Sequence, residues 1–404
     1  MTRSGSVKPV TKDERSAMLD DYTMVTGMSS DYSQLRDQAR EFAAQHVAPI
    51  TRQIDEEDYL PQALWDALTH EDRRYLGSHI PKEYGGAGRD LRAVTILMEE
   101  ISAANFAVGT MIEITTVCPL FVMKYGTEQQ KREILPSIPT GESFMGFMLT
   151  DKGSGSDAAN LHTVARQVGD TFVINGFKRL ASMVDHATLF VVIVRGVDTQ
   201  GRDLGPTAIL VPQGTEGMKI EEKQEVIGLH GHRVYSVSFD DVTVPVTNVL
   251  GEYGRGVDMA VNVLSDTRPT LAGGFVGVAK AALDIALDFA RGWESFNRPI
   301  YKHQGIGFPL AEMSARVEAS RLMAYRAAFL ADSGVPHDRE AAQAKFFCSE
   351  VAIDAIRLAI SVLGHTGATK QSLLEMYLRD ALSFDMAQGS PQIAKLVASR
   401  ALFA

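Results

Sequence analysis

One segment of the sequence, residues 150–157 (TDKGSGSD), combines hydroxyl, acidic and glycine residues at the expected end of a β-strand. Glycine leaves backbone N–H groups accessible to a ligand, and Ser and Thr hydroxyls both donate and accept hydrogen bonds. The segment is therefore a candidate site for a polar ligand. The alternative is an ordinary solvated turn.

Two histidines are candidates for proton transfer. His230 and His232 lie in the predicted loop GLHGHRVYS. A histidine is the side chain that ordinarily titrates near neutral pH, although loop histidines more often have no catalytic role. Cys118 and Cys348 show neither metal-ligand spacing nor a disulfide framework, so we predict no metal site, two small buried side chains and a reducing, cytoplasmic location.

The overall charge argues against nucleic acid as a partner. The 404 residues carry a formal net charge of -10, with no concentrated basic stripe. No signal peptide is recognisable, and the strongest apolar run, residues 187–194 (ATLFVVIV), has the length of a buried strand rather than of a membrane span. We therefore expect no membrane association.

The candidate residues are spread over three regions that differ in their pattern of apolar residues. After a polar leader (1–30), residues 31–142 carry apolar side chains at helical spacing. Residues 143–252 contain short β-rich pieces such as HTVARQV, TFVING, TLFVVIVRG and YSVSFDDVTVP, separated by turn residues. Residues 253–404 return to helical spacing, with long stretches at 257–293, 308–330 and 337–363. We predict an α+β chain with a helical, a β and a second helical domain.

The sequence resembles the acyl-CoA dehydrogenase family of flavoproteins from about residue 31 to its C-terminus. The matching motifs are YGGAG at 84–88, TDKGSGSD at 150–157, NGFK at 175–178, FDDV at 239–242, TRP at 267–269 and RD at 379–380. The resemblance implies an N-terminal helical domain, a small central β-domain and a C-terminal domain of the four-helix-bundle type.

The resemblance also implies FAD as cofactor and an acyl thioester as substrate. It assigns cofactor-binding positions to Thr150, Ser182, Phe296, Gln304, Gly364, Gly367, Ser390 and Gln392. It assigns a contact with the CoA moiety to Ser156 and a place in the active-site helix to Arg268. Each of these residues also has an ordinary structural interpretation, such as a helix cap, a core side chain or a salt bridge.

Several cofactor positions depart from the family pattern. Trp293 stands where the family has an Arg that pairs with the flavin pyrophosphate of a neighbouring subunit, and a neutral indole with one N–H cannot neutralise a diphosphate. Ser361 replaces a cofactor-contacting Gln, His365 replaces a Gly, and Leu180 replaces an aromatic residue that covers the flavin. We therefore predict that FAD binding is weakened.

The residue at the family's catalytic position also differs from the family pattern. The family's catalytic Glu stands eight residues after the Asp of the RD pair, and here that residue is Gln388. An amide is not a useful base near neutral pH, and loss of a general base typically costs ~100- to 10,000-fold in rate. Some relatives carry the base before the Arg matched by Arg268, but that residue is Thr267 here, and the adjacent Asp266 is predicted to point elsewhere.

Three interpretations follow from the resemblance. The first, which we favour, is a flavin-dependent oxidoreductase of the CH-CH type, acting on an acyl-CoA or acyl-carrier-protein thioester with altered or relocated base chemistry. The second is a catalytically silent subunit of a heterotetrameric acyl-CoA dehydrogenase. The third is a reduced-flavin-dependent monooxygenase, or a non-redox enzyme, on the same fold. The resemblance implies an electron-transfer partner or oxygen as acceptor, and a homodimer, homotetramer or heterotetramer.

Overall fold

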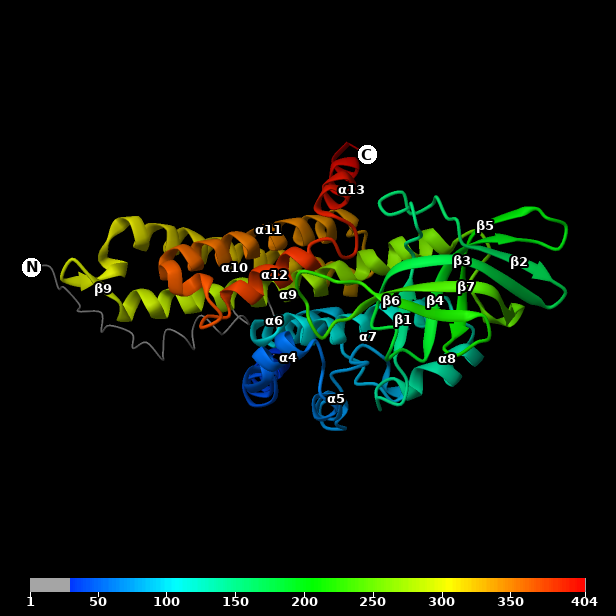
Figure 1. Cartoon of the computed structure of the whole chain (residues 1–404), viewed down its shortest axis with the longest axis horizontal. Helices are drawn as coiled ribbons and strands as arrows, with labels where there is room; N and C mark the ends of the chain where they lie inside the picture. The colour runs from blue at the N-terminus through cyan, green and yellow to red at the C-terminus, as the bar shows by residue number, and fades with distance from the viewer. Residues whose placement is uncertain (1–29, 404) are drawn as a thin grey trace, which may run out of the picture.

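The computed structural model describes residues 30–403, which fold into two groups of helices and a β-sheet (Figure 1). The predicted leader, residues 1–30, lies outside the described residues except for Ser30. The N-terminal helices are α3 (Ser30–Phe42), α4 (Thr51–Glu57), α5 (Gln62–Thr69), α6 (Leu91–Ala104), α7 (Phe106–Tyr125) and α8 (Glu128–Ile134). Figure 1 shows these helices along one side of the molecule, and the sheet at one end of its long axis.

Helices α6 and α7 form the centre of the N-terminal group. Each begins at a side chain that accepts a hydrogen bond from a backbone N–H of the first turn: Asp90 from Ala93 N (2.9 Å) and Asn105 from Val108 N (3.0 Å). Every residue of α7 from Phe106 to Val122 is buried. A helix that is buried on all sides is a core helix.

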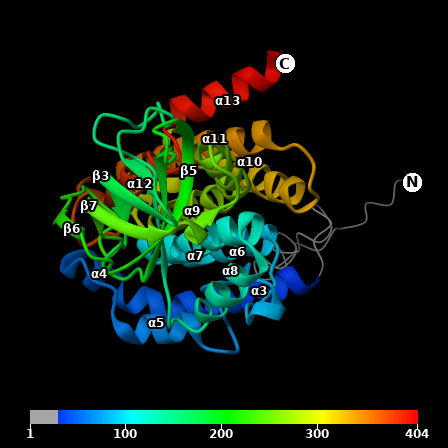
Figure 2. The ribbon, with the colours of Figure 1, turned by 90° about the vertical axis from the view of Figure 1, so that its right-hand side faces the viewer.

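The β-domain is one mixed sheet. Its strands are β1 (Met145–Met148), β2 (Val164–Val168), β3 (Thr171–Ser182), β4 (Leu189–Val197), β5 (Asp203–Pro212), β6 (Met218–Lys223), β7 (Val234–Pro245) and β8 (Val249–Leu250). Their order is β6-β7-β3-β2-β4-β5-β8, and β1 pairs with β4. Strands β1 and β2 run parallel to β4, and the other pairs are antiparallel. Viewed from the end in Figure 2, the sheet stands in front of the helices.

The C-terminal helices are α9 (Gly256–Gly292), α10 (Gln304–Asp332), α11 (Asp338–Leu363), α12 (Leu374–Phe384) and α13 (Pro391–Phe403). Between α9 and α10, strands β9 (Glu294–Ser295) and β10 (Arg298–Pro299) form a small hairpin. Helix α9 packs against α6, α7, α10 and α11, and therefore joins the two helical groups. The predicted α+β fold with its three-part layout is confirmed.

Two helices have the length and apolar composition of a membrane span. They are α7, 94% of whose apolar window is buried inside the protein, and α9, with 72% buried. Burial by other parts of the same chain accounts for their apolar character, because both lie at the centre of the fold. Cys118 and Cys348 are also buried and unpaired, as predicted.

The hydrophobic core does not stop at the domain boundaries. One buried cluster runs from Leu35 on α3 through the sheet to Val263 on α9. A second joins Ile96 on α6 with the C-terminal helices as far as Phe384. The three regions of the sequence therefore pack as one body around α6, α7 and α9.

Candidate functional site

Gln388 lies in the short connection between α12 and α13, at the junction of the two helical groups. Gln388 and Gly389 both have positive φ, 53° and 94°, a conformation that costs a non-glycine residue ~1–2 kcal/mol. The chain re-enters a helix at once, because Ser390 Oγ accepts a hydrogen bond from Ile393 N (3.4 Å) and Pro391 occupies the first helical position. This tight turn directs the Gln388 side chain toward α7 and α9.

The Gln388 amide contacts two side chains. Its Nε2 donates to the Glu113 carboxylate on α7 and to Thr267 Oγ1 on α9 (3.3 Å). Thr267 Oγ1 itself donates to Val263 O (2.9 Å). The two positions at which the family resemblance places a base, 388 and 267, therefore meet in space, and a carboxylate lies beside them.

Two buried polar atoms of this site have no partner among the described residues: Gln388 Oε1 and Arg268 Nε. Buried polar atoms in folded proteins are nearly always hydrogen-bonded, and an orphaned one costs about 1–3 kcal/mol. Such atoms are satisfied when a ligand with complementary groups binds. The orphans thus make the surroundings of Gln388 and Arg268 a candidate ligand site.

Glu113 is a buried acid in an apolar helix. Its side chain is 5% exposed, and burial raises the pKa of Glu113 to about 7, although the hydrogen bond from Gln388 partly offsets this effect. In residues 30–403, no Lys, Arg or His is recorded as an ion-pair partner of Glu113. An acid whose pKa lies near neutrality has the property that a general acid or base needs.

A buried lysine fixes the loop that carries Gln388. Lys345 on α11 donates to the backbone carbonyl of Asp385, and its Nζ lies 3.4 Å from Asp385 Oδ1. Burial lowers the pKa of Lys345 to about 8, with a further lowering from Arg268 and a partial offset from Asp385. Lys345 therefore holds the start of the turn, and Arg268 is close enough to Lys345 to lower its pKa. An anionic or strongly polarised ligand group would be stabilised near these two cations.

The other proton-transfer candidates have structural partners. Asp266 forms ion pairs with Lys124 and with His337 Nε2 (3.2 Å), so it is held away from Gln388, as expected. His230 Nδ1 contacts the carbonyl of Asp55 (2.7 Å). His232 Nδ1 lies 2.6 Å from Thr110 Oγ1, and burial lowers the pKa of His232 to about 4. His232 is therefore neutral near pH 7.

The predicted ligand segment at 150–157 is built around a buried ion pair. Asp151 accepts hydrogen bonds from Thr163 N (2.8 Å) and Thr163 Oγ1 (2.9 Å) and pairs with the buried Lys178. Thr150 is half-buried, whereas Ser156 is exposed. The core of the segment is therefore fixed, and its Gly- and Ser-rich tip faces outward.

Ser182, the predicted flavin contact in β3, lies where the strand is irregular. Leu180 and Met183 on either side of it have φ of 56° and 52°, and the pairing of β3 with β7 shifts register between Lys178 and Ala181. Strained backbone of this kind clusters at ligand sites in other proteins. Leu180 is 57% exposed, so the residue that replaces the covering aromatic is open to solvent.

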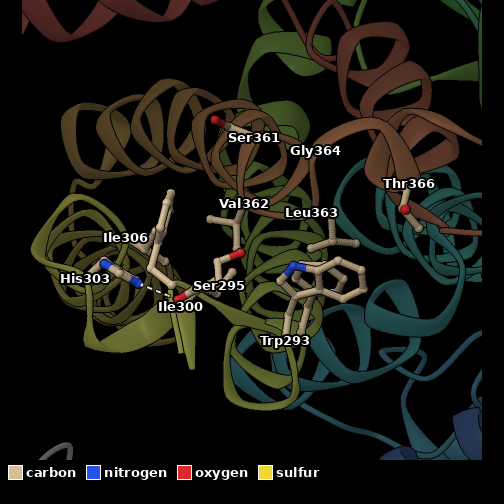
Figure 3. A pocket seen from close by; sticks show the side chains of 12 residues that line it. Trp293, Ser295, Ile300, His303, Ile306, Ser361, Val362, Leu363, Gly364 and Thr366 are labelled. Atoms are coloured by element: carbon tan, nitrogen blue, oxygen red, sulfur yellow. Dashed lines mark hydrogen bonds between the residues drawn. The ribbon is translucent and has the colours of Figure 1, made fainter. Parts of the chain in front are cut away.

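A pocket of about 390 Å³ lies at the C-terminal end of α9, beside the β9–β10 hairpin (Figure 3). It brings together Phe296 and Gly364, two predicted cofactor residues, with Trp293 and Ser361, two departures from the family pattern. The Trp293 ring stacks on Phe289 (5.2 Å between ring centroids) and is 56% exposed. In Figure 3 its indole lies beside Leu363.

The charge of this pocket is low. His303 lines it, with Nε2 3.1 Å from Ser295 O and Nδ1 3.0 Å from the Arg298 guanidinium. Arg298 stands just outside the lining and is exposed. A diphosphate bound in this pocket would contact the hydroxyls of Ser295, Ser361 and Thr366 and the Trp293 indole, with the Arg298 guanidinium nearby.

The predicted site residues fall into separate groups within one chain. Thr150 and Ser182 belong to the β-domain, whereas Phe296 and Gly364 lie at the other end of α9 (Figure 1). The 37 residues of α9 span roughly 55 Å at 1.5 Å per residue. Gln304, Gly367 and Gln392 are not among the residues that line the pocket.

The sequence did not single out Glu113. One signal was available: Glu113 is the one acidic residue in the apolar run FAVGTMIEITTVCPLFV, all of which is buried. Buried carboxylates without a cation are rare enough to suggest a function. Its contact with a residue 275 positions away was not readable from spacing.

The fold is a scaffold of a helical, a β and a second helical domain, and Gln388, Thr267 and Glu113 meet where the helical groups pack together. Residues 29–142, 146–242 and 254–403 match the acyl-CoA dehydrogenase N-terminal, middle and C-terminal domains, respectively, and the chain belongs to the acyl-CoA dehydrogenase family.

Individual relatives cover nearly the whole chain. An acyl-CoA dehydrogenase of Bacillus subtilis is 33% identical over 91% of this chain and 97% of that protein. The mitochondrial short-chain specific acyl-CoA dehydrogenase of Mus musculus is 33% identical over 91% of this chain and 88% of that protein. The structure of butyryl-CoA dehydrogenase from Megasphaera elsdenii superposes with a TM-score of 0.88 at 27% identity, covering 93% of this chain and 99% of that one.

Proposed function

We propose that the protein is a FAD-dependent oxidoreductase that acts on an acyl thioester, with its base chemistry moved away from the usual position. The observation that carries the proposal is the meeting of Gln388 and Thr267 beside a buried carboxylate, with Gln388 Oε1 and Arg268 Nε left unpartnered. Gln388 and Thr267 stand at the two positions where the family resemblance places the base of an acyl-thioester dehydrogenase. The side chains at these two positions do not accept a proton near neutral pH.

The residues present fit FAD, and Trp293 and Ser361 weaken the fit. The orphaned atoms at Gln388 and Arg268 and, separately, the irregular backbone around Ser182 support a bound ligand. Thr150 and Ser182 would hold the flavin end through hydroxyl and backbone groups. When bound, FAD supplies an oxidised ring that accepts a hydride equivalent.

The two groups of cofactor residues support an oligomer. The β-domain residues and the Trp293 pocket lie at opposite ends of α9, too far apart for one dinucleotide. A second chain that places its Trp293 pocket against the β-domain of the first would complete the site. We therefore propose at least a dimer, in which Phe296, Gly364 and neighbouring Arg298 contact the cofactor held by the partner.

This function is tested by adding FAD to the purified protein and recording its visible spectrum and sedimentation. Anaerobic addition of butyryl-CoA, octanoyl-CoA or isobutyryl-CoA should then bleach the bound flavin. Oxygen consumption that requires a flavin reductase, without anaerobic bleaching, would instead identify a monooxygenase. Absence of FAD binding at millimolar FAD would exclude both redox functions for this chain alone.

A second candidate is a silent subunit of a mixed oligomer. The low charge of the Trp293 pocket favours it, because a partner with an Arg at the equivalent position would bind the pyrophosphate better. A silent subunit should be colourless when purified alone. It should acquire flavin and activity only when co-expressed with a homologous chain that carries the catalytic Glu.

A further inference from the structure

The Gln388 site contains a carboxyl group that neither usual base position supplies. Glu113 contacts Gln388 Nε2 directly, and Gln388 in turn contacts Thr267 Oγ1 at 3.3 Å. Glu113 comes from α7, whereas Thr267 and Gln388 come from the C-terminal domain. The three side chains thus meet where α7, α9 and the α12–α13 turn pack together.

Burial of this carboxyl is costly, and the fold does little to offset the cost. An ionised carboxylate in an apolar interior is normally paired with a cation. Glu113 has an amide donor instead, and Cys118 on the same helix is a buried neutral thiol. The nearby His232, which contacts Thr110 one turn before Glu113, is buried and neutral at pH 7. An apolar side chain would be more stable here when the carboxyl is ionised, so Glu113 lowers the stability of the fold at and above neutral pH.

The position of Glu113 matches a chemical need. Dehydrogenation of an acyl thioester requires a group that removes the α-proton, and Gln388 stands where that group usually acts. Glu113 is hydrogen-bonded to the Gln388 amide. The contact with Gln388 uses Glu113 Oε1, so the second carboxylate oxygen, Oε2, is left to accept a proton while Gln388 holds the carboxylate in place.

We propose that Glu113 is the general base of this site, and that Gln388 positions it. This inference rests on the proposed function. The Glu113 carboxylate accepts the α-proton of the acyl thioester, and the electrons of the broken C–H bond form the Cα=Cβ double bond. The β-hydrogen leaves with its electron pair to oxidised FAD, so the thioester is oxidised and the flavin is reduced.

In this arrangement the Gln388 amide has a defined task. It donates to Glu113 and thereby favours the ionised form of the carboxylate, and its free Oε1 accepts a hydrogen bond from the ligand. The carboxyl thus lies on α7 and the amide on the α12–α13 turn. Because the two side chains differ only in an oxygen and an NH2 group, they can be swapped by mutation.

The experiment compares four forms of the FAD-loaded protein: wild type, Glu113→Gln, Gln388→Glu, and the double variant Glu113→Gln with Gln388→Glu. The double variant swaps the acid and the amide and keeps the number of heavy atoms and the net charge. Glu133→Gln, an exposed change on α8, is the matched control for loss of one carboxylate. The rate of anaerobic flavin reduction and deuterium uptake at the α-carbon are measured with butyryl-CoA, octanoyl-CoA and isobutyryl-CoA in D2O.

The proposal predicts that Glu113→Gln binds FAD and lowers both rates by ~100-fold or more, as loss of a general base does. The swapped variant should regain a rate within about tenfold of wild type. The wild-type rate should rise with pH through about 7, because the base acts when ionised and burial raises the pKa of Glu113 to about 7. Glu133→Gln should behave as wild type.

Three results would overturn the proposal. Glu113→Gln with a rate within about threefold of wild type would remove Glu113 as base while leaving the proposed function intact. A silent wild type with an active Gln388→Glu would mean that the base is simply missing. Failure of all four forms to reduce flavin would overturn the proposed function, and the base assignment with it. If Glu113→Gln does not fold, the pH profile of the wild-type rate decides: a rise through about pH 7 supports the proposal, and a rate that does not change with pH there contradicts it.

Discussion

Substitution of Glu113 by Gln should make the protein more stable above neutral pH, by an amount set by its burial. Burial raises the pKa of Glu113 from 4.5 to about 7. Between these values the folded protein keeps a proton that the unfolded chain releases, so the free energy of unfolding falls as pH rises through this window. At about 1.4 kcal/mol per pH unit, the ionised Glu113 costs about 3 kcal/mol above pH 7.

A Gln at this position removes the cost and keeps the contact. Its Oε1 can still accept from Gln388 Nε2, and its Nε2 can donate to Gln388 Oε1, which has no partner within the described part of the chain. The stability difference between Glu113→Gln and wild type should therefore grow by about 3 kcal/mol from pH 4.5 to pH 8.

Urea unfolding of ligand-free wild type, Glu113→Gln and the exposed control Glu133→Gln, at half-unit steps between pH 4.5 and 8.5, measures this difference. The control should track wild type at every pH. A gain for Glu113→Gln that does not change with pH would mean that Glu113 titrates normally in the folded state, and the burial argument would be wrong.

Three further substitutions test other parts of the site. Gln388→Glu brings a second carboxyl against Glu113, and repulsion of ~4 kcal/mol between two ionised carboxylates should make the pair share one proton at pH 7. The unfolded chain releases that proton, so the free energy of unfolding of the variant should fall between pH 7 and 9 by up to about 2.7 kcal/mol more than that of wild type, as measured by urea titration. Trp293→Arg should tighten FAD binding ~10-fold, as measured by flavin fluorescence titration, because a guanidinium forms charge-assisted hydrogen bonds with a diphosphate; an unchanged Kd would mean that the pyrophosphate does not bind there. Asp151→Asn leaves the buried Lys178 without its anion and should lower the free energy of unfolding by about 3 kcal/mol, whereas a neutral effect would imply that Lys178 is uncharged.

Most of the helices and strands could be predicted from the sequence. The stretches predicted as helical at 257–293, 308–330 and 337–363 correspond to α9, α10 and α11. The run ATLFVVIV forms most of the interior strand β4, since β-branched residues suit a strand buried on both faces. Strands β6 and β8 were not predicted. Strand β6 has the partly exposed sequence MKIEEK, and β8 has only two residues, so neither carries a clear hydrophobic pattern.

The candidate site could be predicted from the sequence only in part. The motif order placed Gln388 and Thr267 at family base positions, and the turn at 388–389 brings them together. The side-chain contact with Glu113 depends on how α7 packs against α9, which no local pattern encodes. The cofactor residues stay predictions, since Phe296 and Gly364 line a pocket far from Ser182 in the same chain.

The shared hydrophobic core has a consequence for how the protein can be divided. The cluster from Leu35 to Val263 crosses both boundaries that the sequence suggests, and Asp380 on α12 binds Leu229 N of the β-domain at 2.6 Å. A fragment cut at either boundary would expose a broad apolar face and would be prone to aggregate. Insertions and fusions are better tolerated at exposed hairpin tips such as residues 199–202 than between the regions.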